Sequence, residues 1–112
     1  MNEIKLNIKP LSVNECWQGK RFKTPLYKKY EQNMLLMLPK FKIDIESKLA
    51  VVLEFGFSSP LCDLDNPVKP LIDILQKKYG FNDKNIVKLN ITKVLVKKGL
   101  EYISIKIIDI YK

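Results

Sequence analysis

Two aspartates at alternate positions, Asp63 and Asp65, are the residues best suited to chemistry in this chain. In extended backbone, alternate side chains point to the same side, so both carboxylates would face one cation, and Asp83 supplies a third acid nearby in sequence. The chain has no histidine, and Cys16 and Cys62 form no CxxC motif. Oxygen ligands without such partners indicate Mg²⁺, or Mn²⁺, rather than zinc. A bound divalent ion activates water and stabilises charge on a phosphoryl oxygen, so phosphodiester hydrolysis is the predicted reaction.

Two further charged residues follow this acidic segment. Lys69 lies one turn into the helix expected after Asp65, where it would orient a water, neutralise a transition state or hold a phosphate. Asp73, four residues on, would lie on the same helix face and either pair with Lys69 or join the metal ligands. A simpler interpretation stays open, because the segment 63–66 is by itself more typical of a helix cap.

The net charge of +8 comes from 20 cationic and 12 acidic residues, and 19 of the cations are lysines. The middle of the chain is the exception, since residues 43–83 hold four cations and seven acids. A basic body around an acidic cluster fits a phosphate-binding surface with a metal site set into it. Candidate DNA contacts are the segment Lys20-Arg21-Phe22-Lys23 and the helix cations Lys28 and Lys29. The alternative is a lysine-rich surface that serves solubility.

The periodicity of apolar residues predicts the elements that must position these side chains. In chain order they are a strand over Glu3–Lys9, a loop over 10–23, a helix from Pro25 to Pro39, a strand over Leu49–Phe57, a helix from near Asn66 to Gly80, and a C-terminal β-hairpin of Ile86–Val96 and Glu101–Tyr111. The order β-α-β-α-β-β predicts a single α+β (mixed α/β) domain over 1–112, with two helices packed on a sheet. For Asp83 to rejoin Asp63 and Asp65, the second helix would have to pack obliquely.

The N-terminal residues show no apolar stretch of the kind that a signal peptide contains. The first residues alternate in polarity, and no run approaches the ~18 apolar residues of a membrane span. We therefore expect a cytoplasmic protein with reduced cysteines and no membrane partner.

The motif Asp63-Leu-Asp65-Asn66-Pro-Val-Lys69, followed by Asp73, Gly80 and Asn82-Asp83-Lys-Asn-Ile86, resembles the RusA family of Holliday junction resolvases. Pro10, Ser12 and Asn14 also resemble the N-terminal Pro-x-Ser-x-Asn stretch of that family. The resemblance covers nearly the whole chain. It implies a homodimeric, Mg²⁺-dependent endonuclease that places paired nicks across four-way branched DNA in recombination and repair, typically encoded by phages or prophages.

The resemblance also implies roles for individual residues. Asp63, Asp65 and Asp83 match the metal-binding acids of the family, and Lys69 matches its functional lysine. Three more positions would support these residues by hydrogen bonding or further ligation: Asn66, Asp73 and Asn82, the last standing where some relatives carry a second acid. The DNA contacts expected from the charge pattern and the resemblance together are Asn14, Lys20, Arg21, Lys23, Lys28 and Lys29.

Three alternatives remain beside a junction-resolving enzyme. One is a less selective metal-dependent nuclease, and another is a basic module that binds branched DNA without cutting it. A third is a small structural protein whose charge serves solubility. The presence of all three acids together with Lys69 favours an enzyme.

Overall fold

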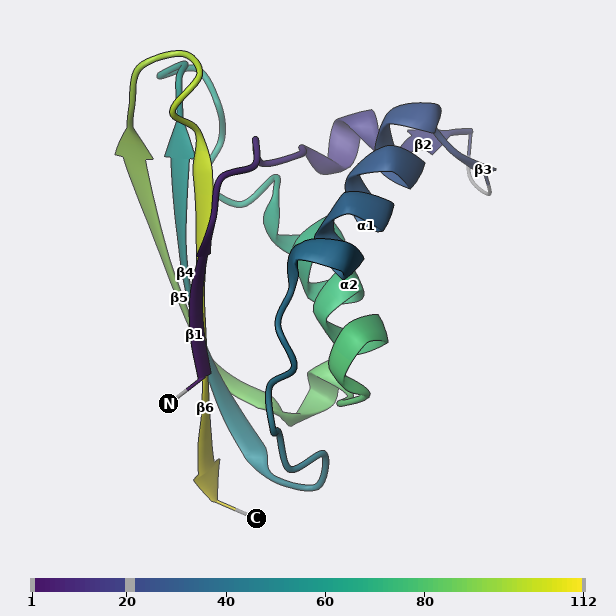
Figure 1. Cartoon of the computed structure of the whole chain (residues 1–112), viewed down its shortest axis with the longest axis vertical. Helices are drawn as coiled ribbons and strands as arrows, with labels where there is room; N and C mark the ends of the chain where they lie inside the picture. The colour runs from purple at the N-terminus through teal and green to yellow at the C-terminus, as the bar shows by residue number, and fades with distance from the viewer. Residues whose placement is uncertain (1, 20–21, 112) are drawn as a thin grey trace.

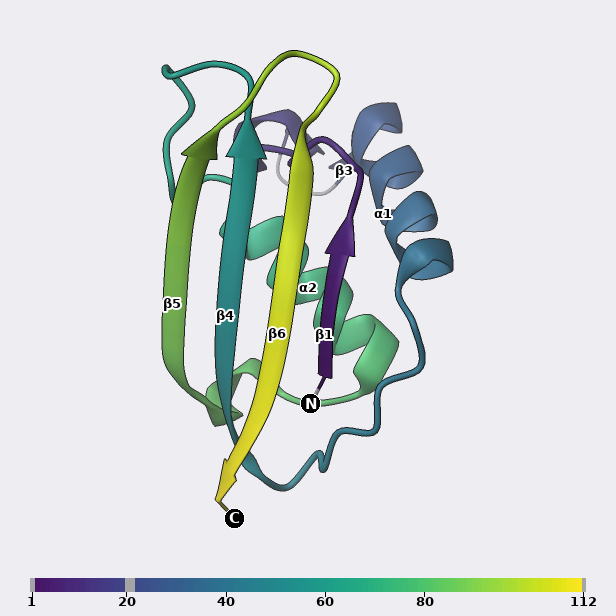
Figure 2. The same cartoon turned by 60° about the vertical axis from the view of Figure 1, so that its left-hand side comes forward.

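A four-stranded sheet with both helices on one face forms the body of the protein (Figures 1 and 2). The computed structural model describes residues 2–19 and 22–111. The sheet has the order β1-β6-β4-β5, and β4 is parallel to β5 and antiparallel to β6. Its strands are β1 (Asn2–Leu6), β4 (Lys48–Phe57), β5 (Ile86–Leu95) and β6 (Tyr102–Tyr111). The predicted α+β class and the order β-α-β-α-β-β of the main elements are confirmed.

The strand β4 lies in the interior of the sheet because its alternate residues are apolar and lie on the face that the helices cover. Leu49, Val51, Leu53, Phe55 and Phe57 are all buried. The neighbouring strand β6 contributes alternate buried isoleucines to the same core: Ile103, Ile105 and Ile107. Burial of such side chains stabilises the fold by roughly 1.5–3 kcal/mol each.

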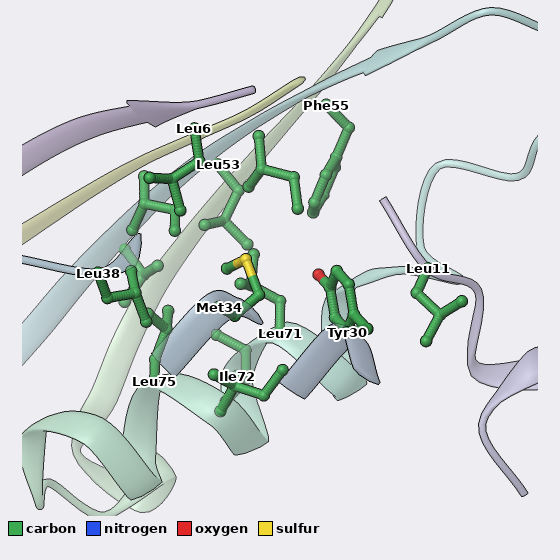
Figure 3. Packing of buried hydrophobic residues seen from close by; sticks show 14 of the residues in the cluster. Leu6, Leu11, Tyr30, Met34, Leu38, Leu53, Phe55, Leu71, Ile72 and Leu75 are labelled. Atoms are coloured by element: carbon green, nitrogen blue, oxygen red, sulfur yellow. The ribbon is translucent and has the colours of Figure 1, made fainter. Parts of the chain in front are cut away.

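The helix α1 (Pro25–Met37) begins as the sequence predicts. The Thr24 side chain accepts a hydrogen bond from the Tyr27 amide at 3.1 Å, and Pro25 fits the first turn, where no backbone partner is needed. Tyr30 and Met34 point from α1 toward β4 in Figure 3 and fill the space between helix and sheet. The apolar face of α1 therefore fixes the helix on the sheet.

The helix α2 (Val68–Tyr79) lies beside α1 on the same face of the sheet (Figure 1). It begins two residues later than predicted, with Pro67 at its N-cap. It ends at Gly80, whose φ of 80° is left-handed and whose amide donates to the Gln76 carbonyl. Glycine meets this conformation at little cost, so the chain can reverse direction there.

The predicted C-terminal β-hairpin is wrong. The strands β5 and β6 do not pair with each other, because both pair with β4 and lie on either side of it (Figure 2). The connection over residues 96–101 passes the end of β4, where the Val96 amide donates to the Phe57 carbonyl at 2.7 Å. An apolar interior strand needs a neighbour on each edge, and this requirement outweighs the local turn signal.

The segment 10–23, expected as a loop, contains short elements. A single turn of 3₁₀-helix, η1 (Val13–Glu15), is followed by a two-stranded ribbon of β2 (Trp17–Gln18) and β3 (Phe22–Lys23). The first strand also ends earlier than predicted, at Leu6 rather than Lys9. Within the described part of the chain, no helix is long and apolar enough to cross a membrane.

Candidate active site

The loop 58–66 leads from the end of β4 to the start of α2 and carries Asp63 and Asp65. Both aspartates are exposed. The amide nitrogen of the Asn66 side chain donates to a carboxylate oxygen of Asp63 at 3.3 Å. Asn66 and Asp63 are therefore hydrogen-bonded neighbours in this loop.

The aspartates of this loop do not cap α2. Within residues 2–19 and 22–111, no side chain forms a cap hydrogen bond at the start of this helix, and Asp65 contributes only its backbone carbonyl to the Val68 amide. The N-cap position is taken instead by Pro67, which has no backbone N–H that needs a partner. The capping interpretation is therefore wrong for this structure, and both carboxylates face solvent.

A second cluster consists of Lys69, Asp73 and Asp83. The ammonium nitrogen of Lys69 lies 2.9 Å from a carboxylate oxygen of Asp73 and 3.9 Å from one of Asp83. The predicted pairing of Lys69 with Asp73 is confirmed. The hydrogen bond to Asp73 raises the pKa of Lys69, although partial burial opposes the shift, and the charges of both carboxylates add to it. Lys69 therefore stays protonated at neutral pH.

Asp83 reaches this cluster because the chain reverses at Gly80 and returns along α2. Gln76 holds the returning segment, since its side-chain carbonyl accepts from the Asp83 amide at 2.8 Å. Asn82 caps the short helix η2 (Asp83–Asn85) by accepting from the Lys84 amide at 3.0 Å. The amide oxygen of Asn82 is thus engaged locally, and the reversal at Gly80 places Asp83 beside Gln76, where its carboxylate lies 3.9 Å from the Lys69 ammonium.

The three predicted metal ligands do not meet at one point. Among the described residues, no group of three or more acids and cysteines is close enough to hold a metal ion. Asp83 lies with Lys69 and Asp73, whereas Asp63 lies with Asn66. Like charges repel and opposite charges attract, which favours such a separation of the acids. The donor set of carboxylate and amide oxygens is nevertheless of the type that suits Mg²⁺.

Contacts from distant segments hold the loop 58–66. At its start, the Ser58 hydroxyl donates to the Glu101 carboxylate at 2.7 Å. At its end, the Val13 amide donates to the Asn66 carbonyl at 2.9 Å. In between, Lys93 of β5 donates to two backbone carbonyls. The sequence analysis missed Glu101 and Lys93, because a single charged residue in or beside a strand gives no sign of a partner so far away in the chain.

A pocket of about 260 Å³ opens beside Asp63. The N-terminal Pro10 and Ser12 line it together with Asn66. Two segments that carry the resemblance are therefore neighbours in space. The other lining residues are Lys9, Glu15, Phe57, Ser58, Ser59, Leu61, Cys62, Pro67 and Glu101.

The expected DNA contacts differ in their surroundings. Asn14, Lys28 and Lys29 are exposed. Lys23 is partly buried and forms an ion pair with Glu31 at 2.9 Å, so an internal partner already engages its charge. The remaining two, Lys20 and Arg21, lie outside the described residues.

Neither a protein-family model nor a curated protein matches the chain.

Proposed function

We propose that this protein is a Mg²⁺-dependent, structure-selective endodeoxyribonuclease that resolves four-way DNA junctions in recombination and repair. The observation that carries the proposal is the contact of Lys69 with Asp83 at the first turn of α2, directly after the loop of Asp63 and Asp65. The same residues carry the resemblance to the RusA family. Exposed acids that do not cap the helix beside them support a role toward a ligand.

Asp63 and Asp65 would hold Mg²⁺, with Mn²⁺ as a substitute, and Asp83, which lies with Lys69 in this structure, would have to move to join them. When bound, the ion supplies activation of water and stabilisation of charge on phosphoryl oxygens. Asn66 orients Asp63 through its side-chain amide. Such partners keep ligating carboxylates in position.

Lys69 would provide the positive charge that faces the scissile phosphate. Its side chain is 64% exposed, so its ammonium can leave Asp83 for a phosphate while Asp73 keeps it near the site. A lysine in this position stabilises the negative charge that grows on the phosphoryl oxygens during hydrolysis. The raised pKa of Lys69 keeps the ammonium charged throughout.

The overall charge of +8 supports a polyanionic substrate. The exposed Asn14, Lys28 and Lys29 would contribute to the DNA surface. Paired nicks across a junction require two sites related by two-fold symmetry, so we propose a cytoplasmic homodimer as the active form.

The test compares cleavage of a labelled four-way junction with cleavage of a linear duplex of matched sequence, each with Mg²⁺ and with a chelator. Paired, Mg²⁺-dependent nicks in the junction alone are the expected result. Equal cleavage of both DNAs would instead indicate a less selective nuclease. Junction binding without cleavage under Mg²⁺ or Mn²⁺ would indicate the non-catalytic module and overturn the proposal.

A further inference from the structure

Lys93 lies at an unusual place for a lysine. In the register of the sheet it is paired with the buried Phe55, so its side chain lies on the face that the helices cover. Its ammonium nitrogen donates to the Pro60 carbonyl at 3.0 Å and to the Cys62 carbonyl at 2.5 Å, and it lies 5.8 Å from the centre of the Phe57 ring. The cation thus ties β5 to the residue that directly precedes Asp63.

This contact reaches the part of the loop 58–66 that the other contacts do not. Glu101 holds Ser58, and Val13 holds Asn66, so these two contacts fix only the ends of the loop. The middle contains local bonds from the Leu61 amide to the Ser59 hydroxyl and from the Cys62 amide to the Ser59 carbonyl. Such local bonds shape a turn without fixing the turn on the sheet.

We propose that Lys93 is a positioning residue that holds Asp63 and Asp65 in place for catalysis by binding the backbone just before them. The inference rests on the proposed nuclease function. Lys93 would act through the loop and not by touching DNA or metal, because the two carbonyls engage two of its three donors. A charged donor to a carbonyl forms a stronger bond than a neutral donor does, so this cation fixes two peptide groups of an exposed loop at once.

Removal of the two hydrogen bonds from Lys93 should release the loop 58–66 without unfolding the sheet. Lys93→Met keeps most of the aliphatic stem but removes the donors, whereas Lys93→Arg keeps donors. Lys88→Met is the matched control, because it removes one positive charge from an exposed position of the same strand. Any loss of general attraction to DNA would therefore affect Lys88→Met and Lys93→Met alike.

The Cys62 thiol reports on the loop independently of cleavage. Cys62 is partly exposed, whereas Cys16 is buried, and burial, with the charges of Glu15 and Asp73, raises the pKa of the Cys16 thiol to about 11. Alkylation at Cys62, followed by mass spectrometry of the labelled peptide, therefore measures the opening of this loop in the folded protein. Cleavage is measured in parallel as the single-turnover rate at saturating enzyme, and junction affinity is measured with a chelator.

We expect Lys93→Met to raise the alkylation rate of Cys62 and to lower the single-turnover rate by about tenfold or more, because small misplacements of reacting groups are costly. Its junction affinity should change no more than that of Lys88→Met, and Lys93→Arg should recover much of the rate. Unchanged alkylation, or a rate no lower than that of Lys88→Met, would overturn the inference while the wild-type protein still cleaves. Absence of cleavage by the wild-type protein would overturn the proposed function together with this inference.

Discussion

The ammonium nitrogen of Lys69 lies 3.9 Å from a carboxylate oxygen of Asp83, although Lys69 is in the first turn of α2 and Asp83 follows its end. The reversal at Gly80 and the hold of Gln76 on the Asp83 amide make this contact possible. The Lys69 side chain therefore links the first motif segment to the second, which the reversal at Gly80 turns back along α2.

Replacement of Asp65 by asparagine should abolish cleavage and keep junction binding. The change removes one negative charge and almost no volume, so a metal ligand is lost while repulsion of DNA is reduced. We expect the single-turnover rate to fall by at least about 100-fold. Asp109→Asn, at an exposed position of β6, is the matched control and should cleave like the wild type. Equal loss of binding and cleavage in Asp65→Asn would indicate a structural role for Asp65.

Replacement of Lys69 by alanine should lower turnover much more than affinity. The lost ammonium would act on charge that develops in the transition state, so a fall of about 100-fold in the single-turnover rate is expected. Lys97→Ala, which removes an exposed charge from the connection between β5 and β6, controls for general attraction to DNA. A change confined to the dissociation constant would place Lys69 in DNA binding alone.

Alanine at Gly80 should reduce both stability and cleavage, whereas alanine at Gly99 should reduce stability alone. Both glycines have positive φ, 80° and 93°, and neither has an atom close enough to clash with an added Cβ. Each replacement should therefore cost about 1 kcal/mol through backbone strain, measured by urea unfolding. Only Gly80 directs the return of Asp83 to Lys69. Equal cleavage rates in the two variants would show that the chain reversal at Gly80 is not needed for cleavage.

The ion pairs of Glu31 with Lys23 and Lys77 should make the free energy of unfolding depend on pH. Burial of Glu31 raises its pKa, but hydrogen bonds and charges from Lys23 and Lys77 outweigh burial, and the net pKa is lowered below 4.5. Because the folded-state pKa is lower than the unfolded one, this stabilisation is present at neutral pH and is lost as pH falls below about 4.5.

Glu31→Gln tests this dependence by urea unfolding at neutral pH and at acidic pH. We expect a loss of about 1 kcal/mol at neutral pH and a smaller loss at low pH, since the carboxylate accepts from two lysines but one of them is largely exposed. Glu46→Gln, at an exposed position, is the control. Identical pH profiles for the two variants would contradict the assignment to Glu31.

Local patterns predict the elements of this fold well but not the pairing of its strands. Thr24 and Pro25 mark the start of α1, and Gly80 marks the end of α2, because caps and breakers act within a few residues. The hairpin prediction is wrong because β5 and β6 each pair with β4, a strand distant in sequence, and not with each other. β4 needs a neighbour on both sides, and a turn signal at residues 97–100 contains no information about that need.

In the candidate site too, local sequence patterns predict some contacts, whereas others depend on parts of the chain that are distant in sequence. The pairing of Lys69 with Asp73 follows from helical spacing, and it is found. Asp83 depends on a chain reversal, and Lys93 depends on the register of β5 against β4, which only the folded sheet defines. Lys23 was expected to face DNA, yet Glu31 binds it, because the ribbon of β2 and β3 places it next to α1.

The interior position of β6 has a consequence for synthesis of the protein. β1 pairs only with β6 within the described sheet, and β4 also needs β6 on one side. While β6 is still inside the ribosome, the N-terminal strand has no neighbour, and Glu101 cannot yet hold Ser58. Contacts so distant in sequence form slowly. The loop that carries Asp63 and Asp65 can therefore reach its final arrangement only after translation of β6.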